Sequence, residues 1–382
     1  MRFSDVQHQD RALSIVRRAM ASGRTHHAYL FEGPEGVGKE LAGRALAARL
    51  LCEAPDLPED ADACGVCRAC QLFAAGNHPD FHLIHRGLHK QHPDRTIRSG
   101  KGLFLVVDVV RHFLIEPSAT SPNLGRRRVF LIRDAERMNE GAQNALLKTL
   151  EEPPGDARLI LVTSSGERLL PTIRSRCQRV PFALLPPDFV EQQLQTLGGV
   201  APAPAAALAV LAQGRLGAAL HWHRIDLLTT LYQVAQGLDS PRIAQPEPFG
   251  KMLLEVAQEL ATRNVEYANN NGDDENGENG KSRGGSKNPG TDELRSALKL
   301  VLLLIASIQR DALLAQVAGP TARKLPPDLP AVERLAATWT ADQLAERIEA
   351  VTTAERMLDR NVAPQLVGEH LAIALTGEAG ES

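Results

Sequence analysis

Residues 33–40 read GPEGVGKE and match the phosphate-binding pattern G-x-x-x-x-G-K-[ST] at every position except the last. The preceding residues 27–32 (HAYLFE) predict a short buried strand. Residues 41–52 (LAGRALAARLLC) predict a helix, because Ala and Leu recur there at helical spacing. A strand, a glycine loop and a helix form the context that this motif requires. The backbone N–H groups, the helix N-terminus and the charge of Lys39 are therefore predicted to face phosphate oxygens.

The last position of the motif departs from the pattern. A Ser or Thr there would place its hydroxyl on Mg²⁺, but this sequence has Glu40. A carboxylate beside a triphosphate repels it unless a metal ion lies between them. The loop is thus predicted to be built for phosphate but poorly equipped to hydrolyse it. Its candidate nucleotide-binding residues are Gly33, Gly36, Gly38 and Lys39.

Two later apolar runs also predict strands that end in polar residues. Residues 129–132 (VFLI) lead to Asp134, and residues 159–162 (LILV) lead to Thr163. Residues 140–152 (EGAQNALLKTLEE) predict a helix between them. Strands that alternate with helices indicate a parallel sheet, whose ligand site lies at the C-terminal ends of the strands. Asp134 and Thr163 therefore join the candidate site.

The residues after the second strand weaken the case for hydrolysis further. ATPases with this loop use an acidic residue at that strand end to hold Mg²⁺, and often a second one to polarise the attacking water. Here Asp134 is present, but Ala135 follows it. Glu136 comes next and is predicted to begin a helix that Asp134 caps. The departures at Glu40 and Ala135 fall on the groups that would handle metal and water.

Four of the five cysteines form a metal-ligand pattern, which favours a reducing compartment over a disulfide framework. They are Cys52, Cys64, Cys67 and Cys70. The two-residue spacings let neighbouring sulfurs meet one tetrahedral ion, and a closed set of four thiolates predicts structural zinc. Unliganded thiols and an iron–sulfur cluster are the alternatives.

The composition limits the remaining classes of function. The chain has 382 residues, enough for two or three domains, and its 43 basic and 46 acidic residues give a net charge of −3. The net charge of the chain therefore gives no indication that it binds nucleic acid. The N-terminus lacks the apolar core of a signal peptide, and the apolar run at residues 300–306 is too short to span a bilayer. We expect a cytoplasmic protein.

A longer stretch carries a specific resemblance. Residues 144–154 (NALLKTLEEPP), followed by Ser175-Arg176-Cys177, are similar to the bacterial clamp-loader family of AAA+ proteins. This resemblance implies an α/β fold, in which an AAA+ P-loop parallel-sheet module is followed by a small helical lid and an all-α collar domain. The implied boundaries are 1–182 for the module with a zinc-binding insertion at 52–70, 183–237 for the lid, and 238–382 for the collar. Composition predicts a disordered insert at 268–291.

The family contains ATP-hydrolysing gamma/tau subunits and a non-hydrolysing delta′ type. Glu40, Ala135 and Gly217, which stands where a lid arginine is expected, make this sequence resemble the delta′ type. The resemblance implies that Arg176 acts in trans as an arginine finger on a neighbour's ATP. It also implies gamma/tau and delta subunits as partners, with the sliding clamp and primed DNA reached through the complex. Polymerase chemistry would belong to the holoenzyme.

Two other functions remain open. One is an active gamma/tau-like ATPase in which Glu40 or Glu136 replaces the missing ligands. The other is a DNA-binding accessory module that uses Arg126–Arg128 and the basic residues within 86–101. Residues 85–102 are predicted to form an exposed polar loop.

Histidines 78, 82, 85, 89 and 92 have helical spacing. Pro79, Gly87 and Pro93 disfavour a helix there, so a second metal site is not the favoured interpretation.

Overall fold

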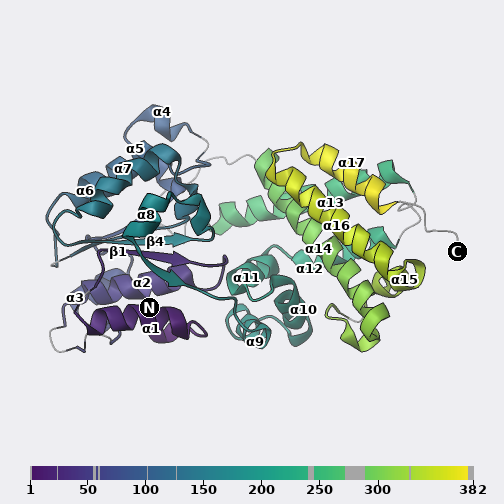
Figure 1. Cartoon of the computed structure of the whole chain (residues 1–382), viewed down its shortest axis with the longest axis horizontal. Helices are drawn as coiled ribbons and strands as arrows, with labels where there is room; N and C mark the ends of the chain where they lie inside the picture. The colour runs from purple at the N-terminus through teal and green to yellow at the C-terminus, as the bar shows by residue number, and fades with distance from the viewer. Residues whose placement is uncertain are drawn as a thin grey trace. The chain divides into compact units, whose positions relative to one another are not determined.

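The computed structural model describes residues 2–23, 25–54, 57–58, 61–100, 102–125, 127–239, 245–271, 289–326 and 328–376. The chain divides into two compact units, Met1–Pro186 and Pro187–Ser382 (Figure 1). The first unit is α/β and the second is helical, which confirms the predicted fold class. The finer division into a lid at 183–237 and a collar at 238–382 stays a prediction.

A parallel five-stranded sheet forms the centre of the first unit, in the order β2-β3-β4-β1-β5. The strands are β1 (Ala28–Glu32), β2 (Phe81–Ile84), β3 (Arg128–Ile132), β4 (Ala157–Thr163) and β5 (Gln178–Pro181). Every residue of β3 is buried, as expected for a strand covered on both faces. The apolar runs of the sequence predicted β1, β3 and β4, whereas β5 was missed.

Helices cover both faces of this sheet (Figure 1). On one side lie α1 (Asp10–Ala21), α2 (Lys39–Leu51) and α3 (Arg68–Ala74). On the other lie α5 (Val107–Val110), α6 (Glu116–Ser118), α7 (Glu140–Glu151) and α8 (Pro171–Arg176). Leu146 and Leu150 of α7 and Ile173 of α8 share one buried core with the strands.

The predicted exposed loop at 85–102 is only partly correct. Residues Arg86–Gln91 form a 3₁₀ helix and Arg95–Arg98 form the short helix α4. Leu88, His89 and His92 are buried, because this segment packs onto the unit and Leu88 joins its core. The five histidines lie on several elements, so they do not align on one helix.

The second unit is helical throughout its described residues. Its helices are α9 (Pro187–Gly198), α10 (Pro202–Ala212), α11 (Leu216–Arg224), α12 (Leu227–Leu238), α13 (Pro246–Asn271), α14 (Thr291–Ala318), α15 (Pro330–Thr338), α16 (Ala341–Asp359) and α17 (Pro364–Leu375). By length and composition α14 could cross a membrane, but half of that apolar window is buried inside the fold. It packs against α13, α15 and α16 as a core helix does.

The predicted disordered insert at 268–291 is mostly outside the described part of the chain. Residues 268–271 form the end of α13, and Thr291 begins α14. Residues 272–288 lie outside the described residues.

Candidate functional site

The loop between β1 and α2 has positive φ angles at three glycines, Gly33, Gly36 and Gly38. Gly33 has a φ of 154°, and a Cβ there would lie 2.4 Å from the Phe182 carbonyl oxygen. Gly38 adopts the left-handed conformation with a φ of 96° and stands at the N-cap of α2. The predicted strand, glycine loop and helix are therefore all present.

The ammonium group of Lys39 contacts this same loop. Its Nζ donates hydrogen bonds to the carbonyl oxygens of Gly33 at 2.6 Å and Pro34 at 2.5 Å. The side chain is buried, which lowers the pKa of Lys39, although the nearby carboxylates of Glu136 and Glu35 oppose that shift. The ammonium group that a phosphate would need is thus already bonded within the chain.

Glu40 is held by two arginines. Its Oε1 accepts from Arg133 Nη2 at 2.8 Å and from Arg44 Nε at 2.9 Å. Burial alone would raise the pKa of Glu40, but the bonds from Arg133 and Arg44 outweigh it and the pKa is lowered. Sequence reasoning missed Arg133, whose only signal was its place between β3 and Asp134.

Asp134 and Glu136 lie at the same edge of the sheet but differ in their partners. Asp134 stands at the N-cap of a short 3₁₀ helix, Ala135–Arg137, as predicted. Its backbone is left-handed with a φ of 50°, however, and its side chain makes no capping bond. Burial, followed by the charges of Glu136 and Glu35, raises the pKa of Asp134. The charged form of the Asp134 carboxyl is therefore disfavoured in the folded chain.

Glu136 joins the ends of β3 and β4. Its carboxylate accepts from Thr163 Oγ1 at 2.7 Å and from the Ser164 N–H at 3.2 Å. Burial would raise the pKa of Glu136, but the Ser164 and Thr163 bonds lower it. The Gly33 N–H also donates to the Thr163 carbonyl at 3.3 Å, so the structure brings the loop and the strand ends together.

Gln9 is a buried residue that sequence reasoning missed. Its Nε2 donates to the carbonyls of Val37 at 3.3 Å and Ala183 at 2.8 Å, and its Oε1 accepts from the Ala183 N–H at 3.0 Å. One amide side chain therefore connects the glycine loop to the chain that follows β5.

Arg176 ends α8 and bonds to its own unit at two points. Its Nη2 forms an ion pair with Glu151 Oε1 at 2.5 Å, and its Nη1 donates to the Thr172 carbonyl at 3.0 Å. About a third of the side chain is exposed, at 34%. The guanidinium is therefore oriented by its own chain while part of it still faces solvent.

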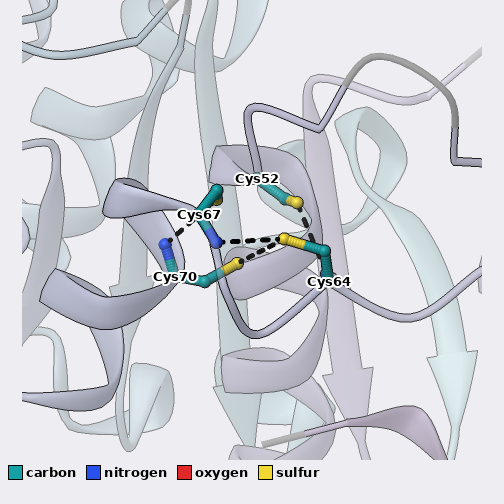
Figure 2. A group of neighbouring side chains, drawn as sticks. All are labelled: Cys52, Cys64, Cys67 and Cys70. Atoms are coloured by element: carbon teal, nitrogen blue, oxygen red, sulfur yellow. Dashed lines mark hydrogen bonds between the residues drawn. The ribbon is translucent and has the colours of Figure 1, made fainter.

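The four predicted cysteine ligands form one cluster (Figure 2). All four sulfurs lie within 4.8 Å of one another, and the Sγ atoms of Cys64 and Cys70 are 3.8 Å apart. Four sulfurs around an ion at about 2.3 Å are separated by about 3.8 Å, so the cluster fits a tetrahedral metal. Cys52 follows α2 and Cys70 lies on α3, so the cluster connects these two helices.

Backbone N–H groups support the thiolates of this cluster. The Cys67 N–H donates to Cys64 Sγ at 3.3 Å, and the Cys70 N–H donates to Cys67 Sγ at 3.4 Å. Bonds from the Cys67 and Val66 N–H groups lower the pKa of Cys64 to about 6, which favours the metal-binding form. The cluster could hold a metal ion.

Two of the arginines proposed for DNA contact, Arg127 and Arg128, bond within the fold. Arg128 is buried and bonds to the Ser121 carbonyl at 2.7 Å, and Arg127 forms an ion pair with Asp156 at 2.7 Å. Arg126 lies outside the described residues. In the second unit, Gly217 lies in the first turn of α11, and Arg215 stacks on Trp222 at 5.5 Å.

A family model and several curated proteins are similar to this chain. Residues 8–186 match the family model described as DNA polymerase III, delta subunit. The chain is 46% identical over 151 residues to the DNA polymerase III subunit delta′ of Pseudomonas aeruginosa, which covers 40% of this chain and 41% of that relative. It is 36% identical over 186 residues to the Bacillus subtilis subunit delta′, covering 49% of this chain and 51% of the relative.

A gamma/tau subunit is also similar. The DNA polymerase III subunit gamma/tau of Mycobacterium bovis is 36% identical over 186 residues, covering 48% of this chain and 29% of the relative. The chain thus spans about half or less of the length of these curated relatives. Residues 8–186 match the DNA polymerase III family model, and the chain is similar to delta′ and gamma/tau subunits of bacterial DNA polymerase III, which confirms the resemblance predicted from residues 144–154 and 175–177.

Proposed function

We propose that this chain is a delta′-like subunit of a bacterial clamp loader in the DNA polymerase III holoenzyme. It does not hydrolyse ATP itself. It presents Arg176 to ATP bound by a neighbouring gamma/tau subunit while the sliding clamp is loaded onto primed DNA. The observation that carries this proposal is that the polar groups of its own nucleotide site bond to one another.

Lys39 and Glu40 make most of the bonds by which the nucleotide site is closed. A γ-phosphate would have to take the Lys39 ammonium from the Gly33 and Pro34 carbonyls. A magnesium ion would meet Glu40, whose carboxylate is already neutralised by Arg133 and Arg44. Ala135, with no polar side chain, cannot polarise an attacking water. Phosphate binding would therefore require Lys39 to leave its carbonyl partners, and water activation lacks its acidic group at position 135.

Arg176 has the chemistry that a neighbour's site needs. A guanidinium spreads its charge and offers forked donors to the phosphate charge that grows in the transition state. Its exposed fraction and its placement at a helix end support an outward role. Because the finger needs no nucleotide in its own chain, it can work on a scaffold whose own site is closed.

The cysteine cluster supports a structural zinc ion held by Cys52, Cys64, Cys67 and Cys70. Four thiolates leave no open coordination position, so the ion would brace the fold and take no part in hydrolysis. The proposed partners are gamma/tau and delta subunits, with clamp and DNA contacted through the assembly. The proposed location is the bacterial cytoplasm.

The direct test is a complex reconstituted with Arg176→Ala. We expect clamp- and DNA-stimulated ATP hydrolysis to fall by on the order of a thousandfold while the assembly forms normally, because the removed group stabilises the transition state. Arg168→Ala, an exposed arginine in the turn before α8, is the matched control. Undiminished hydrolysis in the Arg176 variant would refute the proposal.

A gamma/tau-like ATPase is the second candidate, favoured by the intact glycine loop and by Lys39. It predicts that the isolated chain binds and turns over Mg-ATP. We expect neither binding nor turnover above a Lys39→Met control. A DNA-binding accessory module is disfavoured because Arg127 and Arg128 are engaged within the fold.

A further inference from the structure

We propose that Glu151 is the positioning residue for Arg176. In this view the Glu151 carboxylate fixes the guanidinium in the orientation that a neighbour's phosphate requires. This inference rests on the proposed function, because it takes Arg176 to be the arginine finger.

The contacts of Arg176 suit orientation better than sequestration. Glu151 engages Nη2 at 2.5 Å, and the Thr172 carbonyl engages Nη1 at 3.0 Å. Two acceptors on two different nitrogens define the plane of the guanidinium. The group has five N–H donors, so these two contacts leave three for an incoming phosphate. The side chain is therefore held in place while three of its N–H donors stay available.

The backbone around Arg176 is already fixed by the core. Ile173 is fully buried and Cys177 is almost fully buried, and both pack in the same core as Leu150 of α7. The remaining conformational freedom is that of the long Arg176 side chain. Glu151 is the carboxylate that restrains it, and a restrained group loses less entropy when the phosphate binds.

The position of Glu151 argues against a simple helix-stabilising role. It is the last residue of α7, where the negative end of the helix dipole disfavours a carboxylate. Glu152 follows directly, and the described residues give its side chain no hydrogen bond or ion pair. The two carboxylates share one helix end, but only Glu151 contacts Arg176. Glu152 is therefore a matched control for charge and location.

The test uses the reconstituted complex, with clamp and primed DNA, and measures kcat and KM for ATP. The variants are Glu151→Gln, Glu152→Gln, Arg176→Ala and the double variant Glu151→Gln/Arg176→Ala. We expect Glu151→Gln to lower kcat by about three- to tenfold with little change in KM, because only the transition state uses the finger. Glu152→Gln should match the wild type. Glu151→Gln should have no further effect when Arg176 is absent.

The outcomes separate the two proposals. If Arg176→Ala retains full hydrolysis, the proposed function fails and the positioning role fails with it. If Arg176→Ala loses hydrolysis but Glu151→Gln leaves kcat unchanged or raises it, the finger stands and the positioning role is refuted. An equal loss in Glu151→Gln and Glu152→Gln would also refute it, because the effect would belong to the end of α7. Assembly, followed by size-exclusion chromatography, checks that each variant enters the complex.

Discussion

The glycine loop and the end of α8 lie in the same unit but differ in how their charged groups are bonded. At the loop, Lys39 bonds to carbonyls of its own loop and Glu40 bonds to Arg133 and Arg44. At the end of α8, Arg176 is held by two acceptors yet keeps free donors and an exposed face. Under the proposed function, this nucleotide-binding scaffold closes its own site and still presents a group to another.

Metal removal is expected to have the largest effect, and that effect should be confined to the region of the glycine loop and the cysteine cluster. The cysteine cluster follows α2, the helix that begins at Lys39. If free metal exceeds its dissociation constant a thousandfold, its loss costs about 4 kcal/mol of unfolding free energy. Hydrogen exchange with a strong chelator should show lost protection at 39–74. Protection of α7 and α8 should change little.

A matched control for metal removal is Cys177→Ser, which removes a buried thiol outside the cluster. That variant should respond to the chelator as the wild type does. Equal loss of protection in α7 and α8 would contradict the separation of the two regions.

Arg176→Lys tests whether the finger acts by shape or by charge alone. Lysine keeps the charge but offers no planar fork, so we expect on the order of a hundredfold loss of kcat for ATP hydrolysis by the complex. Arg168→Lys should be neutral. Wild-type activity with lysine at position 176 would mean that a point charge is sufficient.

Arg133→Met tests the closure of the loop site. Glu40 would keep Arg44 but lose its bond to Arg133, and we expect the unfolding free energy to fall by roughly 1–2 kcal/mol. The double variant Glu40→Gln/Arg133→Met should recover part of this loss, since it also removes the half-buried charge. Chemical denaturation of the isolated chain measures both. No coupling between the two substitutions would show that the ion pair contributes little.

The pH dependence of stability is the smallest expected effect. The pKa of Glu40 is lowered in the folded state, so its contribution is present above the unfolded pKa and is lost as pH falls through the folded pKa. Glu40→Gln should therefore weaken the acid-induced loss of stability below about pH 4.5. Asp134→Asn should act in the opposite sense, because the folded pKa of Asp134 is raised and its charge is unfavourable at neutral pH. Thermal melts between pH 3 and 7 would show both.

The sequence predicted the elements that depend on continuous apolar runs. Strands β1, β3 and β4 and helices α2 and α7 follow from buried runs and helical spacing. Strand β5 was missed because it is a short edge strand, QRVP, whose polar residues and final proline resemble a connection.

The four cysteines were predicted together because their spacing is local, and the structure brings them together. The ion pair of Glu40 with Arg133 joins residues 93 positions apart, and no local pattern encodes it. The bonds of Lys39 to its own loop depend on backbone angles at glycines, which composition does not reveal. Long-range pairing and exact loop geometry therefore remained beyond the sequence, whereas the grouping of the four cysteines did not.

The amide of Gln9 gives the glycine loop a structural role that does not depend on a nucleotide. One side chain bonds to Val37 within the loop and to both backbone groups of Ala183, where the chain leaves the sheet toward α9. Movement of Val37 relative to Ala183 must therefore stretch or break at least one of these hydrogen bonds. The geometry of the loop thus helps to hold the segment through which the chain leaves the sheet, independently of any phosphate.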